Sequence, residues 1–181
     1  MRCEEDFLSA ALRYRTQSTG DVEHRLADME SRPQAHAARL SSPAHYYGGI
    51  VSPTGPRPVA VASWHAVVDS GDPVRLADLL AEEVVFRSPA VYAPQEGKEL
   101  TTAYLAAAMV VLGPTLHYVE EWYGDGTAVL EFEAELDGTF VQGIDLLRWN
   151  DEDRLVEFIV MVRPLRGLEK LIELMGRQLS P

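Results

Sequence analysis

A single carboxylate stands out within an alternating stretch near the end of the chain. Residues 139–149 read TFVQGIDLLRW. Strand alternation puts five of these residues on one face, namely Val141, Gly143, Asp145, Leu147 and Trp149. Because this face carries no basic residue, Asp145 is either paired with a group from another element or raised in pKa by loss of solvent. We predict Asp145 as a catalytic acid or base. The alternative is a structural acid paired with Arg148, Arg163 or a hydroxyl.

Two histidines accompany this acid in the second part of the chain, His65 and His117. Each could titrate near neutral pH, and we predict His117 as the partner of Asp145 in proton transfer. Alternation puts His117 on the strand face opposite Leu116 and Tyr118, and leaves open which face is concave. The alternative for both histidines is a surface or interface position.

Charge and composition exclude several classes of function. The chain has 28 Asp and Glu against 16 Lys and Arg, a net charge of −12, which repels nucleic-acid phosphates and anionic lipid headgroups. The single cysteine, Cys3, excludes an internal disulfide and a cysteine-based zinc site. No histidine stands at ligand spacing from Glu120-Glu121 or from the acidic run 151–153, so we predict no metal. Without a glycine-rich phosphate loop, we expect no cofactor.

The chain changes character near residue 57. Residues 1–57 carry no net charge and end in a stretch rich in Pro, Gly, Ser and Ala, which predicts an extension that is mostly disordered or loosely helical. Residues 58–181 carry the whole net charge and are regular, which predicts one folded domain. Neither a basic-then-apolar leader nor an apolar run of membrane-spanning length is present, so we expect a cytoplasmic protein.

The apolar periodicity of residues 58–181 predicts helices followed by a meander of strands. Helices are expected over 58–70, 72–80, 97–112 and 165–179. Strands are expected over 84–86, 116–123, 128–136, 139–149 and 155–163, the last four joined by short hairpin turns. This order predicts an α+β fold in which helices pack on one face of a curved antiparallel sheet.

The strand faces indicate an apolar interior and a second surface that needs a cover. In 128–136, Glu131, Glu133 and Glu135 share the solvated face, and Leu130 and Phe132 share the other. Strand 155–163 is apolar on both faces, so one face fills the concave side and the other requires covering. We therefore expect a homodimer through the outer face of the sheet.

Three strings carry a resemblance to a known family: WHAVVDSGD, VVFRSPAVYAPQEG and GIDLLRWNDEDRLVEF. With the order of elements, they make residues 58–181 similar to the nuclear transport factor 2-like superfamily, in its SnoaL-like and ketosteroid-isomerase-like branch. The resemblance implies a cone-shaped barrel of the NTF2-like or cystatin-like type, with an apolar pocket and usually a dimer. The superfamily includes isomerases, cyclases, epoxide hydrolases, dehydratases and proteins without catalysis.

The isomerase residues carry over only in part. Asp145 matches the buried, protonated acid that this branch uses to hold an oxyanion. The position of the general base is Ser88, and the position of the oxyanion-binding tyrosine is Trp64. A serine without a partner base does not abstract a carbon-bound proton at neutral pH, which argues against the steroid-isomerase mechanism of that branch.

These observations predict a SnoaL-like protein that binds a small hydrophobic molecule. As an enzyme it would be a cofactor-free isomerase, cyclase or hydrolase that transfers protons on a polycyclic or polyketide-like carbonyl compound. The alternatives are a non-catalytic ligand-binding or dimerisation module, or a domain that engages a protein partner through residues 1–57. The predicted substrate-binding residues are Trp64, Ser88, Tyr92, Tyr104, Leu130, Phe132, Leu147, Phe158 and Val160.

Overall fold

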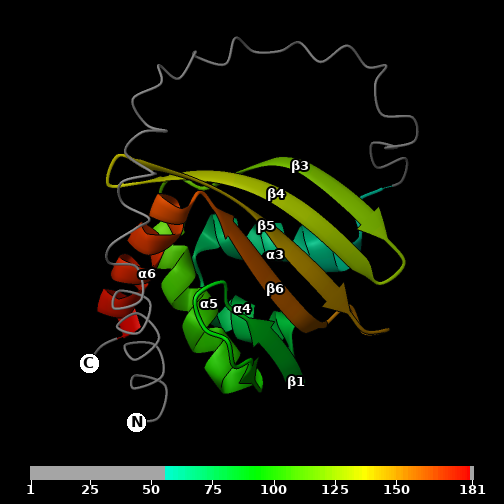
Figure 1. Cartoon of the computed structure of the whole chain (residues 1–181). Helices are drawn as coiled ribbons and strands as arrows, with labels where there is room; N and C mark the ends of the chain where they lie inside the picture. Colours follow the sequence, from blue (N-terminus) through cyan, green and yellow to red (C-terminus); the bar gives the residue numbers. More distant parts are fainter. Residues whose placement is uncertain (1–55, 180–181) are drawn as a thin grey trace, which may run out of the picture.

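The computed structural model describes residues 56–179, which form four helices and six strands (Figure 1). The helices are α3 (Val59–Ser70), α4 (Pro73–Leu79), α5 (Lys98–Leu112) and α6 (Leu165–Leu179). The strands are β1 (Leu80–Arg87), β2 (Gln95–Glu96), β3 (His117–Gly124), β4 (Thr127–Leu136), β5 (Thr139–Trp149) and β6 (Leu155–Arg163). The predictions made for residues 1–55 lie outside the described residues. No helix in 56–179 has the length and apolar character needed to cross a membrane.

The first two helices begin and end within one residue of the predicted bounds. Gly71 ends α3 in a left-handed conformation, with φ at 62°, and its N–H bonds to the carbonyl of Val67. The side chain of Asp72 accepts a hydrogen bond from the N–H of Val74 and so caps α4. β1 starts at Leu80, earlier than predicted, because Leu80 already pairs with Leu155 of β6.

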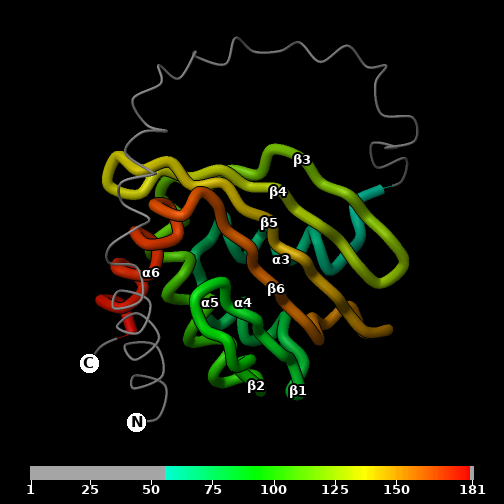
Figure 2. The backbone as a smooth tube through the Cα atoms, viewed as in Figure 1, coloured from blue at the N-terminus to red at the C-terminus, as the bar shows by residue number. Residues whose placement is uncertain are grey.

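The strands form one sheet in the order β2-β1-β6-β5-β4-β3. The four late strands are the predicted antiparallel meander. The expectation of a wholly antiparallel sheet is wrong at one pair, because β1 runs parallel to β6. Parallel neighbours need a long connection, and α5 and strands β3, β4 and β5 lie between β1 and β6 in the chain. The short β2 pairs with β1 at the edge (Figure 2).

The sheet is curved, and its inner face meets the helices (Figure 1). As predicted, Leu130 and Phe132 are buried on the inner face of β4, whereas the glutamates that alternate with the buried residues lie on the other face. In β5, Asp145 lies on the buried face and is only 5% exposed. The fold therefore presents one carboxyl group to the space between sheet and helices.

Gly143 leaves space on the inner face of the sheet for the ring of Phe132. It pairs with Phe132 across β4 and β5. A Cβ atom at position 143 would lie 2.5 Å from the ring of Phe132 and 2.5 Å from the carbonyl oxygen of Met161. Any side chain at position 143, two residues before Asp145, would displace the Phe132 ring from the inner surface of the sheet.

Candidate functional site

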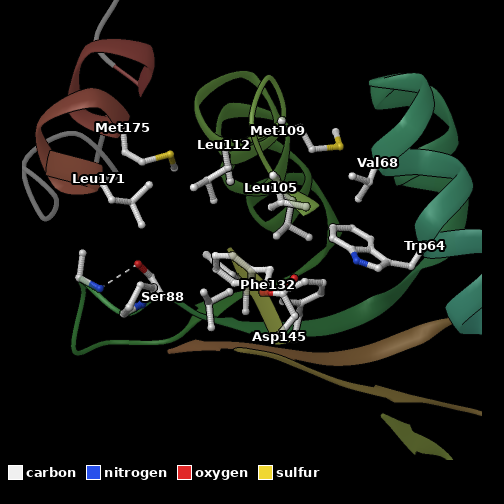
Figure 3. A pocket seen from close by; sticks show the side chains of 18 of the residues that line it. Trp64, Val68, Ser88, Leu105, Met109, Leu112, Phe132, Asp145, Leu171 and Met175 are labelled. Carbon is white, nitrogen blue, oxygen red and sulfur yellow. Dashed lines mark hydrogen bonds between the residues drawn. The ribbon is translucent and has the colours of Figure 1, made fainter. Parts of the chain in front are cut away.

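A cavity of about 60 Å³ lies between the inner face of the sheet and helices α3, α5 and α6 (Figure 3). Its walls are mostly apolar, and the helices contribute Trp64, Val68, Leu105, Met109, Leu112, Leu171, Ile172 and Met175. Phe86, Phe132, Phe158 and Val160 come from the sheet. The polar side chains in this lining are Ser88, Tyr118 and Asp145, together with the indole N–H of Trp64.

Three of these side chains form a hydrogen-bonded chain. The indole Nε1–H of Trp64 donates to the hydroxyl oxygen of Tyr118 over 2.7 Å. That hydroxyl donates to Oδ2 of Asp145 over 2.8 Å. An indole N–H only donates, so the Tyr118 oxygen accepts from Trp64 and its single hydrogen goes to Asp145. The indole fixes the direction of the first hydrogen bond, and in the second the Tyr118 hydroxyl donates to the carboxylate.

This direction determines where Asp145 carries a proton. While Oδ2 accepts the hydrogen of Tyr118, a proton bound to the carboxyl group lies on Oδ1. Within residues 56–179, Oδ1 has no hydrogen-bond partner, and Asp145 is part of the cavity lining. Asp145 therefore offers the cavity a donor when it is protonated and an acceptor when it is ionised.

Burial sets the proton affinity of this group. Loss of solvent raises the pKa of Asp145 from 3.8 to about 7, and the hydrogen bond from Tyr118 opposes part of this rise. Burial likewise raises the pKa of the Tyr118 hydroxyl well above its usual 10.0, so Tyr118 stays neutral. At neutral pH both protonation states of Asp145 are populated, which suits a group that takes up and returns protons.

The arginines considered as partners of Asp145 are engaged elsewhere. Arg148 pairs with Glu157 over 2.6 Å, and Arg163 donates to the side-chain oxygen of Gln142 over 2.7 Å. Of the alternatives open from the sequence, pairing with a hydroxyl is the one observed, and Tyr118 supplies it.

His65 packs against Tyr118, the middle member of the hydrogen-bonded chain. Its ring meets the ring of Tyr118 edge to face, with centroids 4.8 Å apart. Its Nε2 lies 2.9 Å from Oε1 of Glu121, at ion-pair distance but not aligned as a hydrogen bond, and Arg57 contacts the same oxygen at 3.1 Å. Burial lowers the pKa of His65 in spite of Glu121, which favours a neutral imidazole at neutral pH.

The structure brings together six of the residues predicted from sequence. Asp145 is joined in the cavity lining by Trp64, Ser88, Phe132, Phe158 and Val160. Ser88 lies towards the α6 end of the cavity in Figure 3, and its Oγ accepts a hydrogen bond from the N–H of Ala90. Among the described residues, no His, Lys or Arg side chain lines the cavity beside Ser88.

Five predicted site residues lie outside the cavity lining. Leu130 and Leu147 are fully buried in the core, and Tyr104 packs against Phe86 with ring centroids 5.9 Å apart. Tyr92 is fully exposed in the loop between β1 and β2, where no element packs over it. His117 is also exposed and lies 3.5 Å from Glu133 on the outer face, so the structure does not bring it to Asp145.

Tyr118 is the functional residue that sequence reasoning missed. Alternation separates it from His117, and the structure turns Leu116 and Tyr118 inward and His117 outward. The available signal was the apolar Leu116 on the same face as Tyr118. The cavity residues of α5 and α6 were also missed, because the apolar stripe of a helix does not reveal which of its members border a void.

The described residues contain no group of three or more His, Cys, Asp or Glu side chains placed to hold a metal ion. In the cavity, Asp145, Tyr118, Ser88 and the indole of Trp64 can form hydrogen bonds, and Asp145 can take up or release a proton.

Comparison with known proteins agrees with this architecture. A crystal structure of a steroid delta-isomerase from Pseudomonas aeruginosa is 36% identical, with a TM-score of 0.63, over 66% of this chain and 88% of that chain. An uncharacterized bacterial protein with a cystatin-like fold from Silicibacter pomeroyi is 26% identical, with a TM-score of 0.62, over 66% and 84%. The comparison with curated proteins found no match.

The family assignment rests on the sequence itself. The family model for the SnoaL-like domain matches residues 61–158, a span that runs from α3 to the middle of β6 and contains Trp64, Tyr118 and Asp145. The chain therefore belongs to the SnoaL-like domain family of NTF2-like proteins.

Proposed function

We propose that the protein binds an apolar carbonyl compound in this cavity and isomerises it by proton transfer through Asp145. The single observation that carries the proposal is a buried carboxyl group, with a pKa of about 7, in the lining of an apolar cavity. The 36% identity to a protein named a steroid delta-isomerase supports the same class of reaction.

The proposed step is a proton shift within an unsaturated ketone. Ionised Asp145 removes a proton from the carbon between the carbonyl group and the double bond, and the electron pair moves into a dienolate. Oδ1 then returns that proton to the far carbon of the dienolate, which conjugates the double bond with the carbonyl group. The carboxylate is restored, and the substrate and product differ only in the position of one hydrogen and one double bond.

The hydrogen-bonded chain of Trp64, Tyr118 and Asp145 supports this role for Oδ1. Because Tyr118 holds Oδ2, the carboxyl group is oriented and the same oxygen takes and returns the proton. The surrounding rings of Phe132 and Phe158 exclude water, which keeps the pKa of Asp145 high enough for proton removal near neutral pH.

The test is the conversion of a simple non-conjugated enone, followed by the ultraviolet absorbance of the conjugated product. Asp145→Asn retains the shape of the carboxyl group and a donor at the Oδ1 position but cannot exchange a proton. We expect it to bind the enone and to lose at least about a hundredfold in turnover, as is usual for loss of a general acid–base group. His117→Ala, which changes an exposed side chain, is the control and should retain activity. Unchanged turnover in Asp145→Asn would remove Asp145 from the mechanism.

The second candidate function is ligand binding without turnover. It is favoured by the cavity lining, in which Asp145 is the single carboxyl group among the described residues. The resemblance, in turn, puts Ser88 at the position of the base. If the protein only binds its ligand, both the wild type and Asp145→Asn bind the enone and neither forms the conjugated product.

The proposal includes a homodimer through the outer face of the sheet. Phe140 and Met161 lie on that face, and they are 51% and 55% exposed in the single chain. Ile144 pairs with Met161 on the same side and extends the apolar surface. Covering such a surface with a second copy would remove it from water.

A further inference from the structure

The cavity is small for the ligands that such sites usually hold. Its volume is about 60 Å³. Pockets for drug-sized ligands measure about 300–1,000 Å³. An apolar protein cavity of about 150 Å³ accepts benzene, which corresponds to roughly 25 Å³ for each non-hydrogen atom. As it stands, the cavity has room for only about two or three such atoms.

One end of the cavity is closed by α6. Leu171 and Met175 project from this helix into the space beyond Ser88, at the end opposite Trp64 (Figure 3). They are only 5% and 7% exposed, so they fill the interior rather than its rim. These two side chains therefore take up space at the α6 end of the cavity.

The helix itself is held close to the sheet. At Gly167, in the first turn of α6, a Cβ atom would lie 2.9 Å from the carbonyl oxygen of Phe140 and 3.1 Å from Val141. The backbone thus packs directly on β5 at this point, and only glycine allows the approach. Room for a ligand must come mainly from side-chain rotation, for which the unbranched Met109 is well suited.

The opposite wall is equally restricted. Phe132 lies against Gly143, and the ring of Phe158 meets Trp64 edge to face with centroids 4.8 Å apart. Rings packed in this way on a sheet cannot move aside without leaving their neighbours unpacked.

From these contacts we propose that the substrate is a compact acyclic or monocyclic carbonyl compound, and that Leu171 and Met175 of α6 determine this upper size. The inference rests on the proposed function, because it takes Asp145 as the group that the carbonyl compound meets. It narrows the polycyclic class expected from the sequence, since the 17 carbon atoms of a tetracyclic steroid skeleton would need about seven times the present volume at roughly 25 Å³ each.

The test measures affinity for three enones of increasing size with the full chain. The probes are cyclohexenone, a bicyclic enone and a tetracyclic steroid enone. Their binding is measured by titration with protein NMR. Without a size limit the larger, more apolar probes bind more tightly, because they bury more surface. We expect the reverse order for the wild type, with the tetracyclic probe at least about tenfold weaker than cyclohexenone.

Matched variants locate the limit. Leu171→Ala should improve the affinity for the bicyclic probe by about tenfold relative to cyclohexenone. Leu174→Ala makes the same change on the same helix outside the cavity lining, and should keep the wild-type order. If Leu171→Ala does not fold, Met175→Ala carries the same expectation.

The outcomes separate this inference from the proposed function. If the wild type binds the tetracyclic probe most tightly and isomerises it, whereas Asp145→Asn binds it without isomerising it, the size limit is wrong and the proposed function stands. If no probe binds to the wild type or to the widened variants, both are overturned. If Leu171→Ala and Leu174→Ala change the order of affinities equally, α6 does not determine the size.

Discussion

Asp145 should make the stability of the protein depend on pH in a direction opposite to that of most carboxyl groups. Its pKa is raised in the folded protein from 3.8 to about 7. Between these two values the folded protein holds a proton on Asp145 that the unfolded chain has lost. Stability therefore falls as pH rises through this window, because the folded state binds more protons. The contribution is complete below pH 3.8 and is lost above about pH 7.

The size of this effect follows from the window. Each pH unit across it changes the free energy of unfolding by about 1.36 kcal/mol, so the whole window amounts to about 4 kcal/mol. Asparagine at position 145 resembles the protonated acid, since its oxygen can accept from Tyr118 and its amide can donate into the cavity. Asp145→Asn should therefore be close to wild-type stability near pH 4 and more stable than the wild type by about 4 kcal/mol at pH 8.

Urea unfolding of both proteins, followed by tryptophan fluorescence at intervals from pH 4 to pH 8.5, measures this difference. Taking the difference between the two proteins cancels the titration of all other carboxyl groups. The slope of stability against urea should be the same for both, which shows that the substitution acts on the native state. A stability difference that stays constant within about 1 kcal/mol over this range would refute a raised pKa at Asp145.

Two further predictions concern Tyr118 and the outer face. Tyr118→Phe removes the hydrogen bond that lowers the pKa of Asp145, so carboxyl-carbon NMR should find that pKa above its wild-type value of about 7. Tyr123→Phe is the control, because the Tyr123 hydroxyl donates to Glu121. Equal shifts of the Asp145 pKa in both variants would contradict the role given to the Tyr118 hydrogen bond. Met161→Asp places a charge on the proposed dimer face and should halve the mass measured by light scattering. A wild-type mass of one chain would exclude the dimer.

The sequence predicts the fold well because the domain is built from regular periodic elements. In β5, strict alternation is enough to identify Asp145 as an inward-facing acid. The bounds of α3, α5 and the four late strands agree with the predicted ones to within two residues. The parallel pairing of β1 with β6 was not predicted, because local pattern carries no information about which distant strand becomes a neighbour.

The site is harder to predict for reasons that differ between residues. β3 has polar residues on both faces and an irregular register between Tyr118 and Glu120, so its pattern does not indicate which face is inward. This is why the sequence favours His117 and does not reveal Tyr118. Tyr92 lies in a loop, where no periodicity restricts the direction of a side chain.

The tryptophan at the end of the hydrogen-bonded chain has a consequence for the fate of the transferred hydrogen. A proton can pass along a chain of groups only if each member both accepts and donates. The indole nitrogen of Trp64 cannot accept, so a proton on Asp145 has no exit through Tyr118 and Trp64. It leaves only through the cavity, where the substrate sits. In the proposed reaction, an isotopic label taken from one carbon should thus return to another carbon of the same molecule, with little loss to solvent.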